Sequence, residues 1–199
     1  MQRNNFLYNL LSHHFIYSTL QKVMSATTFR KKILNNFIKK KNSCVLDIGC
    51  GPAEILQDFK NLNYYGFDVN SNYINHAKKK YKGNFFCKKF EIKHVKKKKF
   101  DYVLMLGLIH HLSSKETDHL LVQIKKILKK NGKLLTLDNV LLKKQNLIAK
   151  TLIKLDRGKH VRNKNEYVEL LKKRFKFIKL KIYNQKFIPY TYIVSHCSI

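Results

Sequence analysis

The chain has 199 residues, which is enough for one complete core and too few for two comfortable domains. A hydrophobic content of 44%, with 13 Phe and 11 Tyr, indicates a globular protein and argues against disorder. The formal net charge of +29 permits a nucleic-acid partner. The excess is almost all lysine, however, and codon bias in an AT-rich genome produces this composition without selection for a polyanion.

Cysteine usage and hydropathy indicate the compartment. The four cysteines have no spacing typical of a metal site, and a reducing cytosol fits them best, so we expect a cytoplasmic protein. No apolar run approaches the ~20 residues of a membrane span. The N-terminal apolar stretch is interrupted by Ser12-His13-His14 and makes a poor signal peptide.

The first half of the chain alternates apolar runs of strand length with helical stretches. Residues from about 5 to 40 have the apolar spacing of helices, and a break near Ser25-Ala26-Thr27-Thr28 would cap a second helix. An apolar run through Ile48 predicts a buried strand that leads into a Gly-x-Gly turn and a further helix. The other expected elements are strands at Tyr64–Asp68, Asn84–Cys87 and Phe100–Leu106, and a helix at about 72–81 that Gly83 would end.

The second half continues this alternation and closes with two strands. A helix at about 116–130 would stop at Asn131-Gly132, residues typical of a helix C-terminus. Strands alternating with helices predict a parallel sheet covered on both faces. A strand at 133–138, helices at about 143–155 and 164–174, and a final strand pair at 175–183 and 190–197 complete the chain.

The stretch from Asp47 to Asp68 is the one acidic part of this lysine-rich chain. It holds four of the 12 acidic residues (Asp47, Glu54, Asp58 and Asp68) and only one basic residue, Lys60. A strand that enters a Gly-x-Gly turn is typical of a nucleotide-type ligand, but carboxylates near the following helix disfavour a pyrophosphate. A cationic adenosine ligand such as S-adenosylmethionine would be favoured.

The motif spacing supports the same ligand. Asp47, Gly49, Gly51 and Ala53 fit the pattern D-x-G-x-G-x-G/A, whereas a dinucleotide fingerprint would need a small residue where Glu54 stands. This pattern is the first motif of class I S-adenosylmethionine-dependent methyltransferases. The chain resembles that family, in particular its small bacterial, methyltransferase-11-like members.

The resemblance covers roughly residues 40–197 and implies an α/β fold. We expect a single Rossmann-like, seven-stranded, mostly parallel sheet with helices on both faces and an antiparallel C-terminal strand pair. It also implies two parts, an N-terminal helical cap over the cofactor cleft (residues 1–40) and an S-adenosylmethionine-binding methyltransferase domain (residues 41–199).

The resemblance places the cofactor at the carboxyl ends of the strands. Asp47 would lie by the methionine amino group, and Asp68, 21 positions downstream, would bind the two ribose hydroxyls. The family usually has an acid against the adenine amine after the third strand, but here Cys87-Lys88-Lys89-Phe90 follows, so that contact is missing or comes from the backbone. The expected cofactor site comprises Asp47, Gly49, Cys50, Gly51, Asp68, Val69 and Leu106.

The turn after the fourth strand carries the candidate base. Residues 106–112 resemble the "hxxHHh" turn of small methyltransferases, and His110 or His111 could act as a base because imidazole titrates near neutrality. A histidine that only caps the turn is the alternative. Asp138 would face the same cleft as a base or hydrogen-bond partner. A catechol-type metal site would need an acid where Gly107 stands, so we expect no metal.

The acceptor pocket is predicted beyond the fifth strand. The segment 156–162 holds two of the few arginines, and paired arginines would bind an anionic acceptor, although a solvated charged loop is an equal alternative. Tyr190 would join this pocket or merely start the last strand. The expected substrate-binding residues are Arg157, His160, Arg162 and Tyr190.

Two absent motifs bear on the acceptor. The Asn/Asp-Pro-Pro-Tyr turn of nucleic-acid amine methyltransferases does not follow the fourth strand, and the Pro-Cys pair of cytosine-carbon methylation does not occur. We therefore expect O-methylation of a small-molecule, lipid or glycan acceptor by direct in-line transfer. An RNA or other nucleic-acid methyltransferase, or a non-catalytic basic scaffold with the same fold, stays open, and a nicotinamide oxidoreductase would bind the opposite type of ligand.

Overall fold

The computed structural model describes residues 26–155, 158–184 and 190–199, and the chain divides into two compact units, Met1–Lys39 and Lys40–Ile199. In the first unit the described helix is α3, Ala26–Phe37, which begins at the break that predicted a second helix. The predicted helical stretch before residue 26 lies outside the described residues. The role of residues 1–40 as a cap over the cleft stays a prediction.

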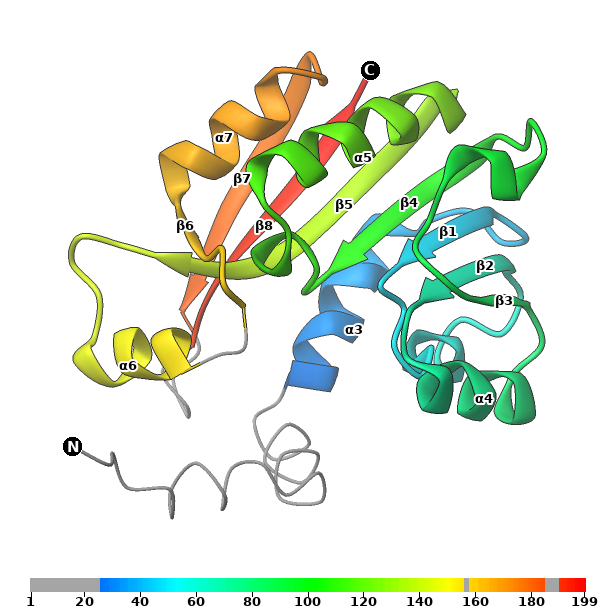
Figure 1. Ribbon diagram of the computed structural model, residues 1–199, viewed down its shortest axis with the longest axis horizontal. Coiled ribbons are helices and arrows are strands. Elements are labelled where there is room, and N and C mark those ends of the chain that lie inside the picture. Colours follow the sequence, from blue (N-terminus) through cyan, green and yellow to red (C-terminus); the bar gives the residue numbers. More distant parts are fainter. Residues whose placement is uncertain (1–25, 156–157, 185–189) are drawn as a thin grey trace. The chain divides into compact units, whose positions relative to one another are not determined.

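The second unit is built on one mixed sheet, whose strand order is β3-β2-β1-β4-β5-β8-β7 (Figure 1). The first five strands of this order are parallel, and β8 is antiparallel to both β5 and β7. The predicted seven-stranded Rossmann-like sheet with an antiparallel C-terminal pair is confirmed. Its strands are β1 Cys44–Ile48, β2 Asn63–Asp68, β3 Asn84–Cys87, β4 Phe100–Leu106, β5 Leu128–Leu141, β7 Phe177–Asn184 and β8 Thr191–Ser198.

Capping side chains fix where several helices begin. The Ser113 hydroxyl oxygen accepts from the Glu116 amide, and the Glu116 carboxylate accepts from the Ser113 amide. Asn163 and Glu166 form the same capping box at the start of a later helix. Asn70 caps the helix after β2 through its side-chain oxygen. The α-helices of this unit are α4 Ser71–Lys80, α5 Ser114–Ile127, α6 Leu147–Leu155 and α7 Lys164–Lys172, and the short 3-10 turns are η1 Glu54–Gln57, η2 Ile92–Val95 and η3 Ile109–His111.

The sheet is covered on both faces. Alternate strand residues such as Leu46, Phe67 and Met105 join one buried cluster with apolar residues of α5 and α7, which lie side by side on that face (Figure 1). Helix α4 contacts β2 and β3, and its buried Ile74 and Ala77 do not belong to this cluster, which places α4 on the opposite face. The carboxyl edge of the parallel strands is left to the connecting loops.

Three local expectations were wrong. The helix expected after the glycine turn is only the short 3-10 turn η1, because Ala53 is left-handed and nine residues separate Ala53 from the start of β2. Helix α5 ends at Ile127, before Asn131-Gly132, and Gly132 instead permits a close approach, since a Cβ there would lie 2.8 Å from the Phe100 carbonyl oxygen. Helix α4 ends at an extended Tyr81 before Gly83 is reached.

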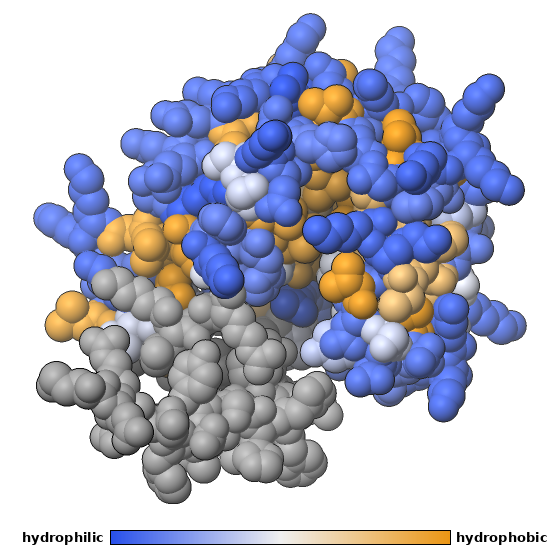
Figure 2. All heavy atoms as spheres, in the orientation of Figure 1, coloured by the Kyte–Doolittle hydropathy of each residue, from blue (hydrophilic) through white to orange (hydrophobic). Residues whose placement is uncertain are grey.

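The surface of the described residues is largely hydrophilic, as Figure 2 shows for one face. The last strand of the sheet order, β7, carries exposed Lys179 and Lys181 at alternate positions. Among the helices of the described residues, none combines the length and apolar character that a membrane span needs.

Candidate active site

The predicted site residues come from the carboxyl ends of four parallel strands. Asp47 lies near the end of β1, Asp68 ends β2, Leu106 ends β4, and Asp138 follows Leu137, the β5 residue that pairs with Leu106. Because these strands are parallel, their carboxyl ends meet at one edge of the sheet, where open α/β sheets bind ligands.

Two left-handed glycines shape the glycine turn. Gly49 has φ +75° and Gly51 has φ +54°, values that side-chain-bearing residues rarely adopt. The amides of Gly49 and Cys50 both donate to the carbonyl of Phe67, at 2.8 and 3.0 Å, so the turn is tied to β2. A Cβ on Gly51 would meet no atom within 4 Å, so this part of the turn faces open space.

Main-chain donors hold the Asp68 carboxylate beside this turn. Its Oδ2 accepts from the Gly51 amide at 2.9 Å, and its Oδ1 accepts from the Asn70 amide at 2.8 Å. Each oxygen keeps a further acceptor position, which suits a diol. Next to it, the apolar side chain of Val69 is 66% exposed, and the Cys87 thiol donates to the Val69 carbonyl at 3.7 Å.

Asp47 belongs to a buried polar cluster that includes a residue that sequence reasoning missed. The Tyr64 hydroxyl donates to Asp47 Oδ2 at 2.7 Å, and both side chains are buried. Burial, with Asp47 nearby, holds the pKa of Tyr64 well above its usual range. Burial and the charges of Asp47 and Asp68 likewise raise the pKa of the Cys50 thiol. No sequence signal singled out Tyr64 beyond its place at the start of a predicted strand.

These residues fit a cationic adenosine ligand. Asp47 and Asp68 supply negative charge, Gly51 leaves open space, and exposed Val69 offers an apolar contact for an aromatic base. The two lysines after Cys87, where the family usually has an acid, are exposed, so no described acid directly after β3 contributes to this site.

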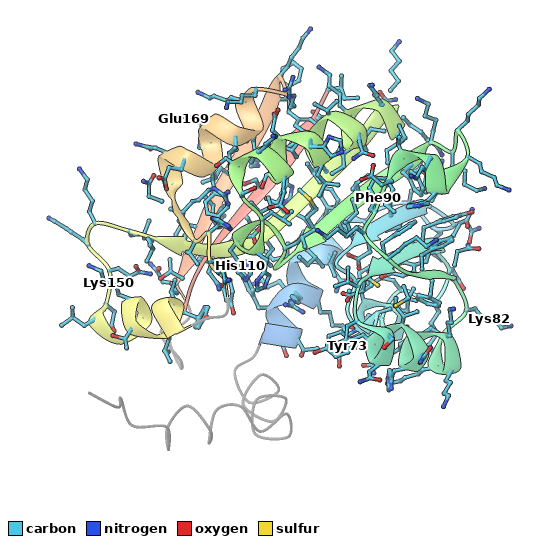
Figure 3. All side chains as sticks on the ribbon, viewed as in Figure 1. Tyr73, Lys82, Phe90, His110, Lys150 and Glu169 are labelled. Atoms are coloured by element: carbon cyan, nitrogen blue, oxygen red, sulfur yellow. The ribbon has the colours of Figure 1, made fainter. Side chains whose placement is uncertain are left out.

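The turn after β4 brings His110 to Asp138. The His110 ring nitrogen Nδ1 lies 2.8 Å from Asp138 Oδ1, and the His110 amide donates to the same oxygen at 3.1 Å. Both residues are buried, His110 within η3 near the end of β4 (Figure 3). This pattern assigns Nδ1 as the donor to the carboxylate and leaves Nε2 as the basic nitrogen.

Burial raises the pKa of the Asp138 carboxyl, although the hydrogen bonds from His110 oppose the shift. Its Oδ2 is buried without a hydrogen-bond partner among the described residues, so its desolvation is only partly compensated. His111 differs from its neighbour, because it is exposed and its ring packs on that of His110 with centroids 4.1 Å apart.

The predicted acceptor residues are found in different environments. His160 is exposed and Tyr190 half-buried, with the Tyr190 hydroxyl 3.5 Å from Asn139 Nδ2. Arg162 is buried, and its guanidinium donates to main-chain carbonyls within the protein. Its expected contact with an anionic acceptor stays a prediction. Arg162 lies in β6, Arg162–Asn163, a short strand paired with β5 that was not predicted. Arg157 lies outside the described residues.

Among the described residues, no group of three or more His, Cys, Asp or Glu side chains could hold a metal ion. The expectation that the reaction uses no metal stays a prediction.

The sheet order and the glycine turn with its strand-ending acids define a Rossmann-like protein for a nucleotide-type ligand. Residues 46–134 match the model of a family described as a methyltransferase domain. This match covers 89 of the 199 residues, and together with the sheet order it makes the chain similar to class I S-adenosylmethionine-dependent methyltransferases, enzymes whose cofactor is S-adenosylmethionine.

Solved structures share the fold. An S-adenosylmethionine-dependent methyltransferase from Archaeoglobus fulgidus is 17% identical with a TM-score of 0.69, and the match covers 94% of this chain and 100% of that one. The plantazolicin methyltransferase BpumL, in complex with a triazolic desmethylPZN analogue and S-adenosylhomocysteine, is 20% identical with a TM-score of 0.61, and the match covers 89% of this chain and 84% of that one. The mitomycin 7-O-methyltransferase MmcR is 15% identical with a TM-score of 0.63, covering 96% and 60%. A comparison with curated proteins found no match.

Proposed function

We propose that this enzyme methylates an oxygen of a small-molecule, lipid or glycan acceptor, with His110 as the general base. The observation that carries the proposal is the buried His110–Asp138 pair, whose carboxylate lies in the strand next to β4 at the same sheet edge as Asp47 and Asp68. An oxygen acceptor must lose a proton to become a good nucleophile, and an oriented imidazole supplies the base.

In this mechanism the chain's own residues have distinct tasks. When bound, S-adenosylmethionine supplies a methyl group already activated by the positive sulfur. Asp68 would hold the ribose hydroxyls of the bound cofactor, and Asp47 would lie by its ammonium group. His110 accepts the acceptor's hydroxyl proton at Nε2 as the oxygen attacks in line, and Asp138 stabilises the imidazolium through Nδ1. Placement of the acceptor provides much of the rate.

The acceptor class rests on several supports. BpumL is a plantazolicin methyltransferase and MmcR is a mitomycin 7-O-methyltransferase, so this fold serves small-molecule acceptors in other proteins. The turn after β4 lacks the prolines of nucleic-acid amine methyltransferases.

The four cysteines are free thiols, which supports a reducing compartment such as the cytoplasm.

A nucleic-acid acceptor is the second candidate, and the net charge of +29 is the observation that favours it. Lysine supplies nearly all of this charge, and it does not provide the planar, bidentate contacts of arginine. The small-molecule acceptor is therefore preferred.

Calorimetry tests the cofactor site first. Asp68→Asn is expected to weaken S-adenosylmethionine binding by about tenfold to a hundredfold, because a hydrogen bond to a charged group contributes about 1.5–3 kcal/mol. Asp58→Asn, which removes an exposed acid of the same stretch, serves as the matched control and should change the affinity little. Equal losses in the two variants would contradict the assignment of Asp68.

Methyl transfer from labelled cofactor to fractionated cell extract tests the acceptor and the base. Label is expected in the small-molecule, lipid or glycan fraction, and His110→Asn should reduce transfer by about 10²–10⁴-fold while cofactor affinity is kept. Label that enters a nuclease-sensitive fraction would establish the nucleic-acid alternative. Full transfer by His110→Asn would exclude His110 as the base.

A further inference from the structure

Arg162 makes an unusual set of contacts for a buried charge. Its Nη1 donates to the carbonyls of Ile109 and His160, at 3.0 and 3.1 Å. Its Nη2 donates to the carbonyl of Leu112 at 2.7 Å and lies 3.4 Å from the Ser114 hydroxyl oxygen. The guanidinium fork thus joins β6 to the main chain of the turn after β4.

The carbonyls that Arg162 binds lie on either side of the candidate base. Ile109 precedes His110, and Leu112 follows the end of η3. A 3-10 turn this short has few hydrogen bonds of its own, here His111 to Leu108 and Leu112 to Ile109. The guanidinium therefore gives the Ile109 carbonyl a second donor, and it supplies a donor to the Leu112 carbonyl, which accepts neither of these two bonds.

The same segment touches His110 at two further points. The amide of His160 donates to the His110 carbonyl at 2.9 Å. A Cβ on Gly158 would lie 2.2 Å from His110 Cδ2 and 3.0 Å from the His110 carbonyl oxygen. Only glycine fits at that position without moving the ring, so residues 158–162 bind the turn from outside while Asp138 holds the ring from the sheet.

We infer that Gly158 and Arg162 are positioning residues that hold His110 in register with Asp138. This inference rests on the proposed role of His110 as a base. Arg162 fits this task and lysine does not, because one planar fork reaches both sides of the turn whereas an ammonium is a compact point donor. Residues 158–162, which follow β5 and were expected to bind the acceptor, thus hold the base in position, and Arg162 does not itself bind an anion.

The decisive variant is Arg162→Lys, which keeps the charge but loses the fork. The readout is the Nδ1 proton of His110 in ¹⁵N-histidine-labelled enzyme saturated with S-adenosylhomocysteine, assigned by its loss in His110→Asn. We expect its exchange with solvent to accelerate at least about tenfold, methyl transfer to fall at least about tenfold, and cofactor affinity to stay within about twofold. Gly158→Ala should give the same pattern.

Arg174→Lys is the matched control. Arg174 binds Asp118 through Nε and Nη2 at 2.8 and 2.6 Å, so this variant also weakens an arginine contact with α5, away from His110. The two variants are compared at an equal loss of melting temperature, so that general destabilisation is the same in both. Under that condition Arg174→Lys should leave the exchange rate of the His110 Nδ1 proton and the rate of methyl transfer unchanged. The positioning role would be overturned if Arg162→Lys left the exchange rate of the His110 Nδ1 proton unaltered, or if both variants changed this rate equally.

The outcomes also separate the two proposals. If His110→Asn abolishes transfer while Arg162→Lys leaves the His110 proton and transfer unaltered, only the positioning role fails. If His110→Asn transfers methyl groups at the full rate, the proposed base fails, whatever Arg162→Lys does.

Discussion

At the residue scale, the space beneath the glycine turn depends on one further glycine. Gly66 pairs in register with Asp47, and a Cβ there would lie 2.9 Å from both Cys50 Sγ and Tyr64 Cε1. The absence of a side chain thus lets Tyr64 reach Asp47 and lets Cys50 pack under the turn. Gly66 serves packing, whereas Gly51 has a left-handed φ and open space before it.

The two glycines predict separable effects. Gly66→Ala should lower the free energy of unfolding by about 1–3 kcal/mol through overpacking, measured by urea unfolding. Gly51→Ala should lower the free energy of unfolding by about 1–2 kcal/mol, because its positive φ disfavours a residue with a side chain. It should also weaken S-adenosylmethionine binding, measured by calorimetry. Equal affinity in Gly51→Ala and wild type would show that the ligand does not approach this part of the turn.

The sequence predicted those residues whose position follows from local pattern. Asp47 and Asp68 stand where an apolar run ends, and parallel strands bring such ends together without further information. The sequence did not predict the hydrogen bond of Tyr64 to Asp47 or those of Arg162 to the turn after β4. The partner of Tyr64 lies 17 positions away, and these partners of Arg162 lie 50 or more positions away. A local pattern carries no record of such partners.

At the element scale, periodicity found the strands but not all of their limits. The fifth strand was expected at 133–138, yet β5 begins at Leu128, where it pairs with Phe100 before a shift of register. Tertiary pairing, and not local propensity, extends the strand through polar residues. The same holds for β6, whose two residues form a strand only because β5 passes beside them.

The antiparallel pair holds a titratable group with a predictable effect. Half-buried His196 in β8 has a lowered pKa, chiefly through burial and further through Lys179 of β7 and Lys133 of β5. Because the folded state disfavours the charged imidazole, its contribution to stability is present above the unfolded pKa of about 6.5 and is lost as pH falls through the folded value.

His196→Gln should therefore reduce the pH dependence of stability. The melting temperature of wild type should fall more than that of the variant between about pH 7.5 and about pH 5. Differential scanning calorimetry across this range provides the measurement. An identical decline in both proteins would place the responsible proton on another group.

At the scale of the whole molecule, charge is the dominant feature. A net charge of +29 on 199 residues destabilises a compact state through self-repulsion. The exceptions are local, such as Asp118 with Arg174 and Asp101 with Lys129. The acids of the cofactor edge lie within this positive field, which disfavours cationic ligands elsewhere on the surface.

Salt should therefore stabilise the protein. Raising NaCl from about 20 mM to about 300 mM shortens the screening length to below about 10 Å, and each 1 kcal/mol of repulsion removed should raise the melting temperature by about 2–4 °C. Sodium chloride is preferred to sulfate, which strengthens apolar burial by itself. A melting temperature that falls with salt would mean that attractive pairs outweigh the repulsion.

The lysines of β7 have a consequence for molecules that meet in solution. Among the described strands, β7 is the last of the sheet order and pairs with β8 along one edge only, so another strand could add along its other edge. Lys179 and Lys181 would then face the same residues of a second copy at close range, and like charges brought together repel. Two copies joining edge to edge would thus be opposed from the outset, which guards against fibrous assembly.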